Sequence, residues 1–309
     1  MKILVTGATG FIGGEFVKNT QFDLRCVVRK NKENNFNDVF EIDGLNTNTN
    51  WQGAFDGVDV VVHFAGIAQS EQTNQEEYEQ INFKGTLKLA EEAASAGVKR
   101  FIFISTALVN GNNTNEKPFS EKDKVFPANA YATSKYKAEQ SLQSLALKSN
   151  MDFVIIRPPV VYGNGVKSNF TTLVKLVKKL PILPFGLAHN SRSYLSVLNF
   201  IDFIELCLFN DKVANQTFLI SDNESISTKE LTNRINGVFG KKTRQLPVPI
   251  FIFKLLGLIL ARKRLTEQLF GNFEVNCSKA INLLGWQPKF TMEQTLLKFK
   301  KEEKINVEI

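Results

Sequence analysis

The feature that most constrains this chain is a glycine motif at its start, where Gly7, Gly10 and Gly13 follow an apolar run at residues 3–5. In such a motif one glycine forms a tight turn, another lets the backbone approach phosphate, and the third lets a helix pack closely on a strand. A strand that passes through this turn into a helix offers helix N–H groups to a dinucleotide pyrophosphate. The motif therefore predicts the first strand and helix of a dinucleotide-binding α/β sheet. Cofactor contacts are expected from Gly7, Thr9, Gly10, Phe11, Ile12 and Gly13.

Apolar, strand-like runs recur along the first half of the chain, at residues 24–28, 39–42, 58–63, 100–104 and 153–157. Helical stretches separate them, including residues 76–96, which end before Gly97, and residues 129–148. This alternation predicts an α/β fold of the Rossmann type, with a doubly wound parallel sheet and helices on both of its faces.

The regular alternation fades after residue 165, where prolines interrupt shorter helical pieces. We therefore predict a dinucleotide-binding domain at residues 1–165, to which the chain returns at 196–221. Residues 166–195 and 222–309 are expected to form a smaller, mostly helical substrate-binding lobe.

A tyrosine, a lysine and two hydroxyl side chains are the candidates for chemistry. Tyr131 and Lys135 are four residues apart, so their side chains share one face of the predicted helix. An ammonium group beside a phenol lowers the pKa of the tyrosine, which suits proton transfer while a hydride moves. Ser105 and Thr106 follow a strand, and α/β proteins bind ligands at that edge of the sheet. The sequence predicts a redox site in which a hydroxyl holds a substrate oxygen against Tyr131.

The formal net charge of +7 suits an anionic partner. Lys and Arg are scattered, and no basic stripe alternates with aromatic residues, so we expect a phosphorylated small molecule and no nucleic acid. The chain has only two histidines, His63 and His189, and its three cysteines lie far apart, so no metal site is expected. Cysteine usage and the lack of a signal-peptide pattern predict a cytoplasmic protein.

Residues 249–261 form a strongly apolar segment, and Arg262, Lys263 and Arg264 follow it. The segment is too short to span a bilayer. Two interpretations stay open: a helix in the core, and a helix that lies on an anionic membrane surface through residues 249–264.

Further motifs occur in order along the chain: His63-Phe-Ala-Gly66, Asn82-Phe-Lys-Gly85-Thr86, Ser105-Thr106, Tyr131 with Lys135, Arg157-Pro-Pro, Val161-Tyr-Gly163 and Leu284-Gly-Trp-Gln-Pro288. With them the chain resembles an extended short-chain dehydrogenase/reductase of the nucleotide-sugar epimerase/dehydratase type over nearly its whole length. The resemblance implies a UDP-sugar substrate and a homodimer built from two long helices.

The resemblance also implies roles for single residues. It makes Tyr131 the catalytic acid and base, while Lys135 holds the nicotinamide ribose and tunes that tyrosine. Thr106 lies 25 positions before Tyr131, the family's usual interval, and is therefore preferred over Ser105 as the hydroxyl that contacts substrate. Further cofactor contacts are implied at Ala65, Gly66, Asn82, Ser105 and Pro158. His63, on a buried strand, is expected to be a core residue.

The choice between the two nicotinamide cofactors depends on the end of the second strand. An acidic residue there binds the ribose of NAD, whereas cations accommodate the extra phosphate of NADP. Arg29 and Lys30 stand at this place, which favours NADP over NAD. Asp43, at the end of the third strand, resembles the family position that contacts adenine.

Substrate contacts other than Thr106 are expected in the less regular lobe, at Asn169, Phe185, Arg192 and Arg264. These positions fall where relatives bind the nucleoside and diphosphate of a sugar nucleotide. Arg192 is the main candidate for the diphosphate, because a guanidinium offers paired donors to phosphate oxygens. Arg264 is the second candidate, and a surface role for it stays open.

One position departs from the family pattern. Many epimerases have an Asn that contacts substrate after the Arg157 motif, but here Val160 follows Pro159. Other segments, such as Val109-Asn-Gly111, are most similar to UDP-4-keto-6-deoxy-N-acetylglucosamine C4 reductases, which serve surface polysaccharide synthesis. We predict an NADPH-dependent reduction at C4 of a UDP-4-keto sugar. The alternatives are a UDP-glucose or UDP-N-acetylglucosamine 4-epimerase with tightly held NAD, and a non-catalytic protein that senses NADP.

Overall fold

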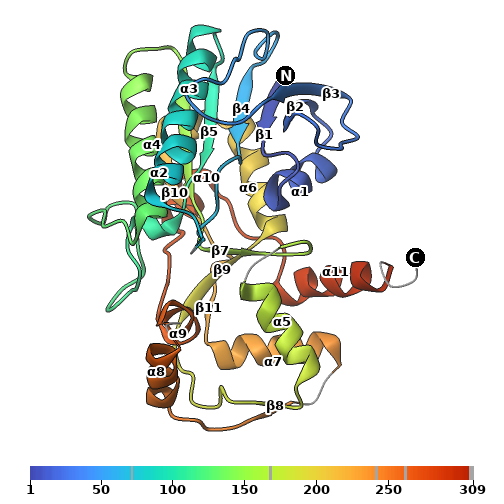
Figure 1. The fold of residues 1–309 in the computed structure, drawn as a ribbon, viewed down its shortest axis with the longest axis vertical. Coiled ribbons are helices and arrows are strands. Elements are labelled where there is room, and N and C mark those ends of the chain that lie inside the picture. The colour runs from blue at the N-terminus through green and yellow to red at the C-terminus, as the bar shows by residue number, and fades with distance from the viewer. Residues whose placement is uncertain (71, 167–168, 241–242, 261–262, 306–309) are drawn as a thin grey trace.

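A parallel sheet of seven strands forms the centre of the upper lobe in the computed structural model, which describes residues 1–70, 72–166, 169–240, 243–260 and 263–305 (Figure 1). The strand order is β10-β6-β5-β4-β1-β2-β3. Their bounds are β1 (Lys2–Thr6), β2 (Asp23–Arg29), β3 (Asp38–Ile42), β4 (Val60–His63), β5 (Arg100–Ile104), β6 (Asp152–Arg157) and β10 (Gln216–Leu219). Val60, Val61 and Val62 are all buried, because both faces of the sheet are covered.

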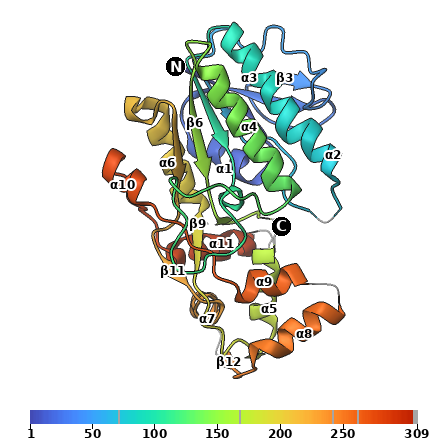
Figure 2. The ribbon, with the colours of Figure 1, turned by 90° about the vertical axis from the view of Figure 1, so that its left-hand side faces the viewer.

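Helices lie on both faces of this sheet (Figures 1 and 2). One face carries α1 (Phe11–Asn19) and α6 (Val197–Phe209), and the other carries α3 (Thr86–Ser95) and α4 (Ala130–Ala146). Alternate side chains of β1 enter the two layers, since Ile3 packs in the cluster of Phe16, whereas Leu4 packs in the cluster of Leu89. The predicted doubly wound α/β fold of the Rossmann type is confirmed.

The helix expected at residues 76–96 is divided in three. It begins as α2 (Gln75–Tyr78), which Asn74 caps, continues as a π-helical segment at Glu79–Gly85, and then becomes α3. The π-helical segment carries Asn82, whose buried side chain accepts from the backbone N–H of Ile67 at 2.7 Å and donates to its carbonyl at 3.0 Å. Asn82 thereby fixes the loop after β4, as π-helical turns often do near functional sites.

The lower lobe consists of helices and short strands (Figure 1). Its helices are α5 (Asn169–Lys179), α7 (Thr228–Phe239), α8 (Ile250–Ile259), α9 (Lys263–Phe270) and α11 (Met292–Ile305). Its strands are β7 (Val160–Tyr162), β9 (Arg192–Ser196) and β11 (Ser225–Ile226) in one sheet, and β8 (Ile182–Leu183) and β12 (Arg244–Gln245) in another. Phe170, Val174, Leu231 and Ile235 belong to its hydrophobic core.

The chain crosses between the lobes more than once. β9 leads directly into α6, and β10 then joins the sheet beside β6. Later, α10 (Ser278–Leu284) packs near β10, where Lys279 donates to the carbonyl of Thr217 at 2.8 Å, and Trp286 donates to Asp202 at 2.9 Å. This piece lies against the upper lobe, although the boundaries expected from the sequence group it with the substrate-binding lobe.

Within the apolar segment at residues 249–261, helix α8 spans Ile250–Ile259, while residues 261 and 262 lie outside the described residues. Within the described chain, we find no helix with the length and apolar character that crossing a bilayer requires.

Candidate active site

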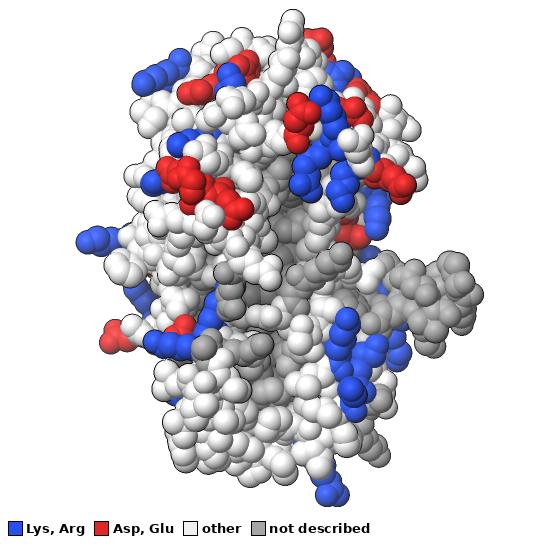
Figure 3. All heavy atoms as spheres, viewed as in Figure 1, with Lys and Arg blue, Asp and Glu red and all other residues white. Residues whose placement is uncertain are grey.

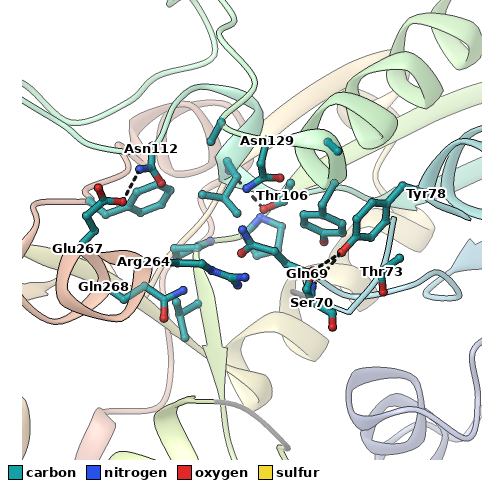
Figure 4. A pocket seen from close by; sticks show the side chains of 18 of the residues that line it. Gln69, Ser70, Thr73, Tyr78, Thr106, Asn112, Asn129, Arg264, Glu267 and Gln268 are labelled. Atoms are coloured by element: carbon teal, nitrogen blue, oxygen red, sulfur yellow. Dashed lines mark hydrogen bonds between the residues drawn. The ribbon is translucent and has the colours of Figure 1, made fainter. Parts of the chain in front are cut away.

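A pocket of about 520 Å³ opens between the two lobes, beyond the carboxyl ends of the sheet strands. Thr106, Tyr131 and Pro158 line it from the upper lobe, and Arg192 and Arg264 line it from the lower lobe. Figure 4 shows Tyr78 and Ser70 on one side of this space and Arg264, Glu267 and Gln268 on the other. The pocket therefore gathers the predicted catalytic hydroxyls and the predicted phosphate-binding cations.

Tyr131 stands in the first turn of α4, which begins after Asn129. The side chain of Asn129 caps the helix by accepting from the backbone N–H of Ala132 at 2.9 Å. Burial raises the pKa of Tyr131 to about 12; neighbouring Tyr78 adds to this rise, and a hydrogen bond with Thr106 offsets part of it. Burial therefore outweighs the lowering of this pKa that the sequence predicts from Lys135.

Lys135 projects from the same face of α4, one turn after Tyr131. Its ammonium group donates to the carbonyl of Ile104 at 2.9 Å and lies 4.7 Å from the centre of the Phe103 ring. Burial lowers the pKa of Lys135 to about 8, and the nearby carboxylate of Glu139 offsets part of that shift. A side chain at Gly66 would come within 3.4 Å of this ammonium group, so glycine keeps the space beside it open.

A buried ion pair supports these residues from behind. Glu139 accepts from Arg157 Nε at 2.9 Å and from the hydroxyl of Ser105 at 2.5 Å, and Arg157 also donates to Asn110 at 3.0 Å. The hydroxyl of Ser105 thus points into the protein, and a cofactor contact from Ser105 would have to come from its backbone. Sequence reasoning missed Glu139, although it follows Lys135 by four residues on the same helix face.

The glycine turn has the shape that a dinucleotide pyrophosphate requires. Gly7 adopts a φ of +72°, and a Cβ there would lie 2.7 Å from the backbone nitrogen of Ala65. A Cβ on Gly13 would lie 2.3 Å from the carbonyl oxygen of Gly7. Gly10 precedes α1 without a side-chain cap, so the first-turn N–H groups of Phe11, Ile12 and Gly13 face outward for a ligand. These residues fit the phosphates of a nicotinamide dinucleotide.

His63 is a core residue, as expected. It is fully buried between the hydroxyls of Thr6, at 2.6 Å, and Thr86, at 2.9 Å. Burial holds the pKa of His63 well below its usual value. Thr6 also accepts from the backbone N–H of Ala65 at 3.2 Å, which ties the loop after β4 to the glycine turn.

Arg29 and Lys30, at the end of β2, differ in whether they form an ion pair. The ammonium group of Lys30 pairs with Asp43 at 2.8 Å, and both side chains are largely exposed. Arg29 is exposed, and no carboxylate within the described ranges forms an ion pair with it. The guanidinium of Arg29 is therefore the better placed of the two cations to meet an added phosphate, while Asp43 is held beside Lys30.

Arg192 forms the base of the pocket from β9. Its guanidinium is buried, donates to the carbonyl of Gly271 at 3.0 Å, and packs 5.4 Å from the centre of the Phe273 ring. Burial lowers its pKa and Tyr194 offsets part of that fall, while across the described parts of the chain no carboxylate pairs with it. A buried guanidinium without a counter-ion is suited to an anionic ligand.

The other predicted substrate residues divide into two groups. Arg264 lines the same pocket as Arg192, and Asn169 lines an adjoining pocket of about 720 Å³ that also includes both arginines. Asn169 donates to Gln268 at 2.5 Å. Phe185 instead packs in the lower core between the rings of Phe253 and Phe270 and lines neither of these two pockets, so its contact with substrate finds no support in this geometry.

Comparisons with known proteins identify the family of this chain. A model of the NAD dependent epimerase/dehydratase family matches residues 3–221. A UDP-glucose 4-epimerase of Vibrio cholerae is 39% identical over 304 residues, which cover 94% of this chain and 92% of the relative. Among solved structures, UDP-glucose 4-epimerase of Thermotoga maritima with UDP-glucose has a TM-score of 0.79 at 21% identity, covering 99% of this chain and 100% of that one. UDP-glucuronic acid 4-epimerase of Bacillus cereus in complex with NAD has a TM-score of 0.77 at 21% identity and covers 99% of both chains. The two solved structures share the fold.

Proposed function

We propose, from the premise that this chain belongs to the NAD dependent epimerase/dehydratase family, that it transfers hydride at C4 of a UDP-sugar and reduces a UDP-4-keto sugar with NADPH. The chain is an enzyme of the nucleotide-sugar epimerase/dehydratase type. One observation carries the proposed chemistry: Thr106 and Tyr131 line a single pocket together with the buried cation Arg192. UDP-4-keto-6-deoxy-N-acetylglucosamine is the proposed substrate.

The reduction adds one hydride and one proton across the C4 carbonyl. When bound, the nicotinamide dinucleotide supplies the hydride. Tyr131 donates its phenolic proton to the oxygen that develops negative charge, and the hydroxyl of Thr106 donates a hydrogen bond to that oxygen. Lys135, whose pKa is about 8, carries a positive charge at neutral pH and stabilises the phenolate that remains.

Arg192 and Arg264 hold the diphosphate in this proposal. The guanidinium of Arg192 donates to backbone carbonyls on its inner side, and the pocket lies on its other side. Its paired N–H donors match two phosphate oxygens. This places the sugar toward Tyr131 and the nucleoside toward the adjoining pocket that Asn169 lines.

Two features favour net reduction over epimerisation. Arg29 stands where an enzyme that uses NAD has a carboxylate for the ribose, which supports NADPH as the reductant. Val160 lines the pocket with an apolar side chain, so the polar substrate anchor of many epimerases is missing there.

A UDP-glucose 4-epimerase is the second candidate, because the Vibrio cholerae relative at 39% identity carries that name. The same groups would serve it. Tyr131 would take the proton from the hydroxyl at C4 while the hydride would pass to the bound NAD, and both would return after the sugar has rotated to present its opposite face.

Incubation with NADPH and UDP-4-keto-6-deoxy-N-acetylglucosamine separates the two candidates. A reductase consumes one NADPH for each sugar converted, followed by absorbance and by chromatography of the products. Exchange of UDP-glucose or UDP-N-acetylglucosamine with its C4 epimer, without net consumption of cofactor, would instead identify an epimerase. Binding of NADPH without turnover of any of these sugars would favour the sensor.

The cofactor preference is tested by Arg29→Asp. We expect NADPH binding to weaken by about 10- to 100-fold, the value of a lost charged hydrogen bond, while NADH binding changes little. Lys32→Asp, an exposed cation on the following turn, is the matched control. Equal weakening of both cofactors by Arg29→Asp would refute the NADP preference.

A further inference from the structure

Helix α8 exposes apolar side chains along its whole length. Phe251 is 67% exposed and Ile259 69%, and Leu255, Leu258 and Leu260 are also more than half exposed. Among its described residues only Gly257 is buried. A helix that is apolar on nearly every side is normally buried in a core or in lipid. The core interpretation left open by the sequence is therefore wrong for this helix.

The helix contacts the lower lobe through a narrow stripe. Phe253 packs 4.7 Å from Phe270 and 6.4 Å from Phe185, measured between ring centres, and Gly257 lies one turn further along the same side. With about 100° between successive residues of a helix, Phe251, Leu255 and Ile259 fall on the opposite side. The apolar face thus points away from the protein.

Two lysines, Lys254 and Lys263, border this apolar face. Lys254 falls at the border between the contact stripe and the exposed face. Lys263 follows at the start of α9 with a largely exposed side chain, 3.9 Å from the partly exposed carboxylate of Glu267. Between Glu230 and Glu267 the sequence has eight Lys or Arg and no Asp or Glu. In Figure 3 the lower left of the molecule, over α8, shows no acidic side chain.

We propose that α8 lies in the plane of an anionic lipid bilayer, with Phe251, Leu255 and Ile259 at the boundary between headgroups and acyl chains and Lys254 and Lys263 among the lipid phosphates. This goes beyond the proposed function, which needs no membrane. An exposed apolar helix face that is bordered by cations suits the surface of an anionic membrane. Ten residues are too few to cross a bilayer, so the helix rests on it.

A second copy of this chain is a poorer occupant of the same face. In a twofold dimer the same surface patch lies on both sides of the interface, so each copy would bring Lys254 and Lys263 into it. Like charges brought together at an interface oppose association, whereas lipid phosphates complement them.

The membrane surface would lie near the mouth of the active site. A second pocket of about 530 Å³, lined by Lys254, Leu258 and Lys263, shares Asn112 and Glu267 with the pocket that contains Tyr131. Docking through α8 therefore sets the substrate entrance beside the lipid headgroups.

Co-sedimentation with vesicles tests the proposal with the full-length protein. One set of vesicles contains phosphatidylglycerol and phosphatidylcholine, and the other contains phosphatidylcholine alone. We expect the protein to pellet with the anionic vesicles at low ionic strength and to be released at about 0.5 M salt, because salt screens the attraction between lysines and phosphates. Leu255→Asn/Ile259→Asn should lower the bound fraction at least fivefold.

Phe126→Asn/Leu147→Asn is the matched control, since these side chains are 75% and 89% exposed and lie in the upper lobe. It should bind vesicles as the parent does, and circular dichroism should show both variants folded. The proposal is overturned if the parent stays in the supernatant with anionic vesicles, or if both variants reduce binding equally. It is also overturned if Leu255→Asn/Ile259→Asn only converts a dimer into a monomer in light scattering.

Discussion

The two lobes differ in whether their buried charges are paired and whether their apolar faces are covered by other parts of the protein. In the upper lobe, Arg157 is paired with Glu139, and Lys135 donates to the carbonyl of Ile104. In the lower lobe, buried Arg192 has no carboxylate partner among the described residues, and the apolar face of α8 has no cover. The upper lobe pairs its buried charges internally. The lower lobe presents groups that another molecule would complete: a diphosphate for Arg192 and a membrane for α8.

The largest expected effect is the loss of turnover in Tyr131→Phe, because the phenolic proton has no substitute at the substrate oxygen. We expect kcat to fall by about 10²- to 10⁴-fold, the usual contribution of a general acid. The affinity for UDP-sugar, measured by calorimetry, should stay close to that of the parent, since the lower lobe binds the diphosphate. Tyr136→Phe on the same helix is the control, and turnover near the parental rate in Tyr131→Phe would remove this residue from the mechanism.

Glu139→Gln should destabilise the protein strongly, because it leaves the buried guanidinium of Arg157 without its counter-charge. We expect the free energy of unfolding in urea to fall by about 3–5 kcal/mol. The lower lobe supplies the contrast in Glu224→Gln, which removes one of the partly exposed partners of Arg234 and should cost about 1 kcal/mol or less. Similar losses for both variants would contradict the difference between the lobes.

Arg192→Met should act on binding more than on folding. Removing the charged donors raises KM for the UDP-sugar by about 10- to 100-fold, as expected for lost hydrogen bonds to a charged group, and leaves kcat within a few-fold. Arg234→Met in the same lobe, whose carboxylate partners lie away from the pocket, should lower stability without changing KM. An unchanged KM in Arg192→Met would place the diphosphate elsewhere.

The smallest effect concerns pH. Burial keeps His63 neutral in the folded protein, with its pKa well below the usual value, whereas the unfolded chain binds a proton there below pH 6.5. Between those two pKa values the unfolded state holds more protons, so this residue lowers the free energy of unfolding as pH falls. Going from pH 7.5 to 5.5, its contribution is a loss of about 1.4 kcal/mol.

Urea unfolding of His63→Gln at the two pH values checks this expectation, because the variant should lose that part of the pH dependence. His189→Gln, at an exposed site in the lower lobe, should keep the parental dependence. If both variants show the parental slope, His63 does not carry the effect.

Local patterns were enough to predict much of the upper lobe. The spacing of Tyr131 and Lys135 on one helix, and the position of Thr106 just after a strand, are short-range features whose geometry follows from regular secondary structure. The same helix rule extends from Lys135 to Glu139, which was missed because a carboxylate at this spacing is common on helix surfaces. Its importance arises from Arg157, which reaches it from the neighbouring strand β6.

The lower lobe was less predictable. Phe185 and Arg192 were both expected at the substrate, yet the structure places Phe185 among core rings and Arg192 at the pocket. Irregular segments with short strands lack a period that would show which side chains face inward. Whether α8 is buried or exposed likewise depends on which other elements pack against it, and the sequence does not show this.

The amino-acid sequence by itself determined the doubly wound sheet, the glycine turn and the family, because these follow from the periodicity of apolar residues and from backbone shapes that only glycine accepts. Tertiary structure alone decided that burial raises rather than lowers the pKa of Tyr131, that Arg192 has no counter-ion within the described chain, and that α8 is exposed. The burial of a side chain, its ion pairs and the elements that cover it depend on segments that are distant in sequence. A local sequence pattern does not encode these contacts.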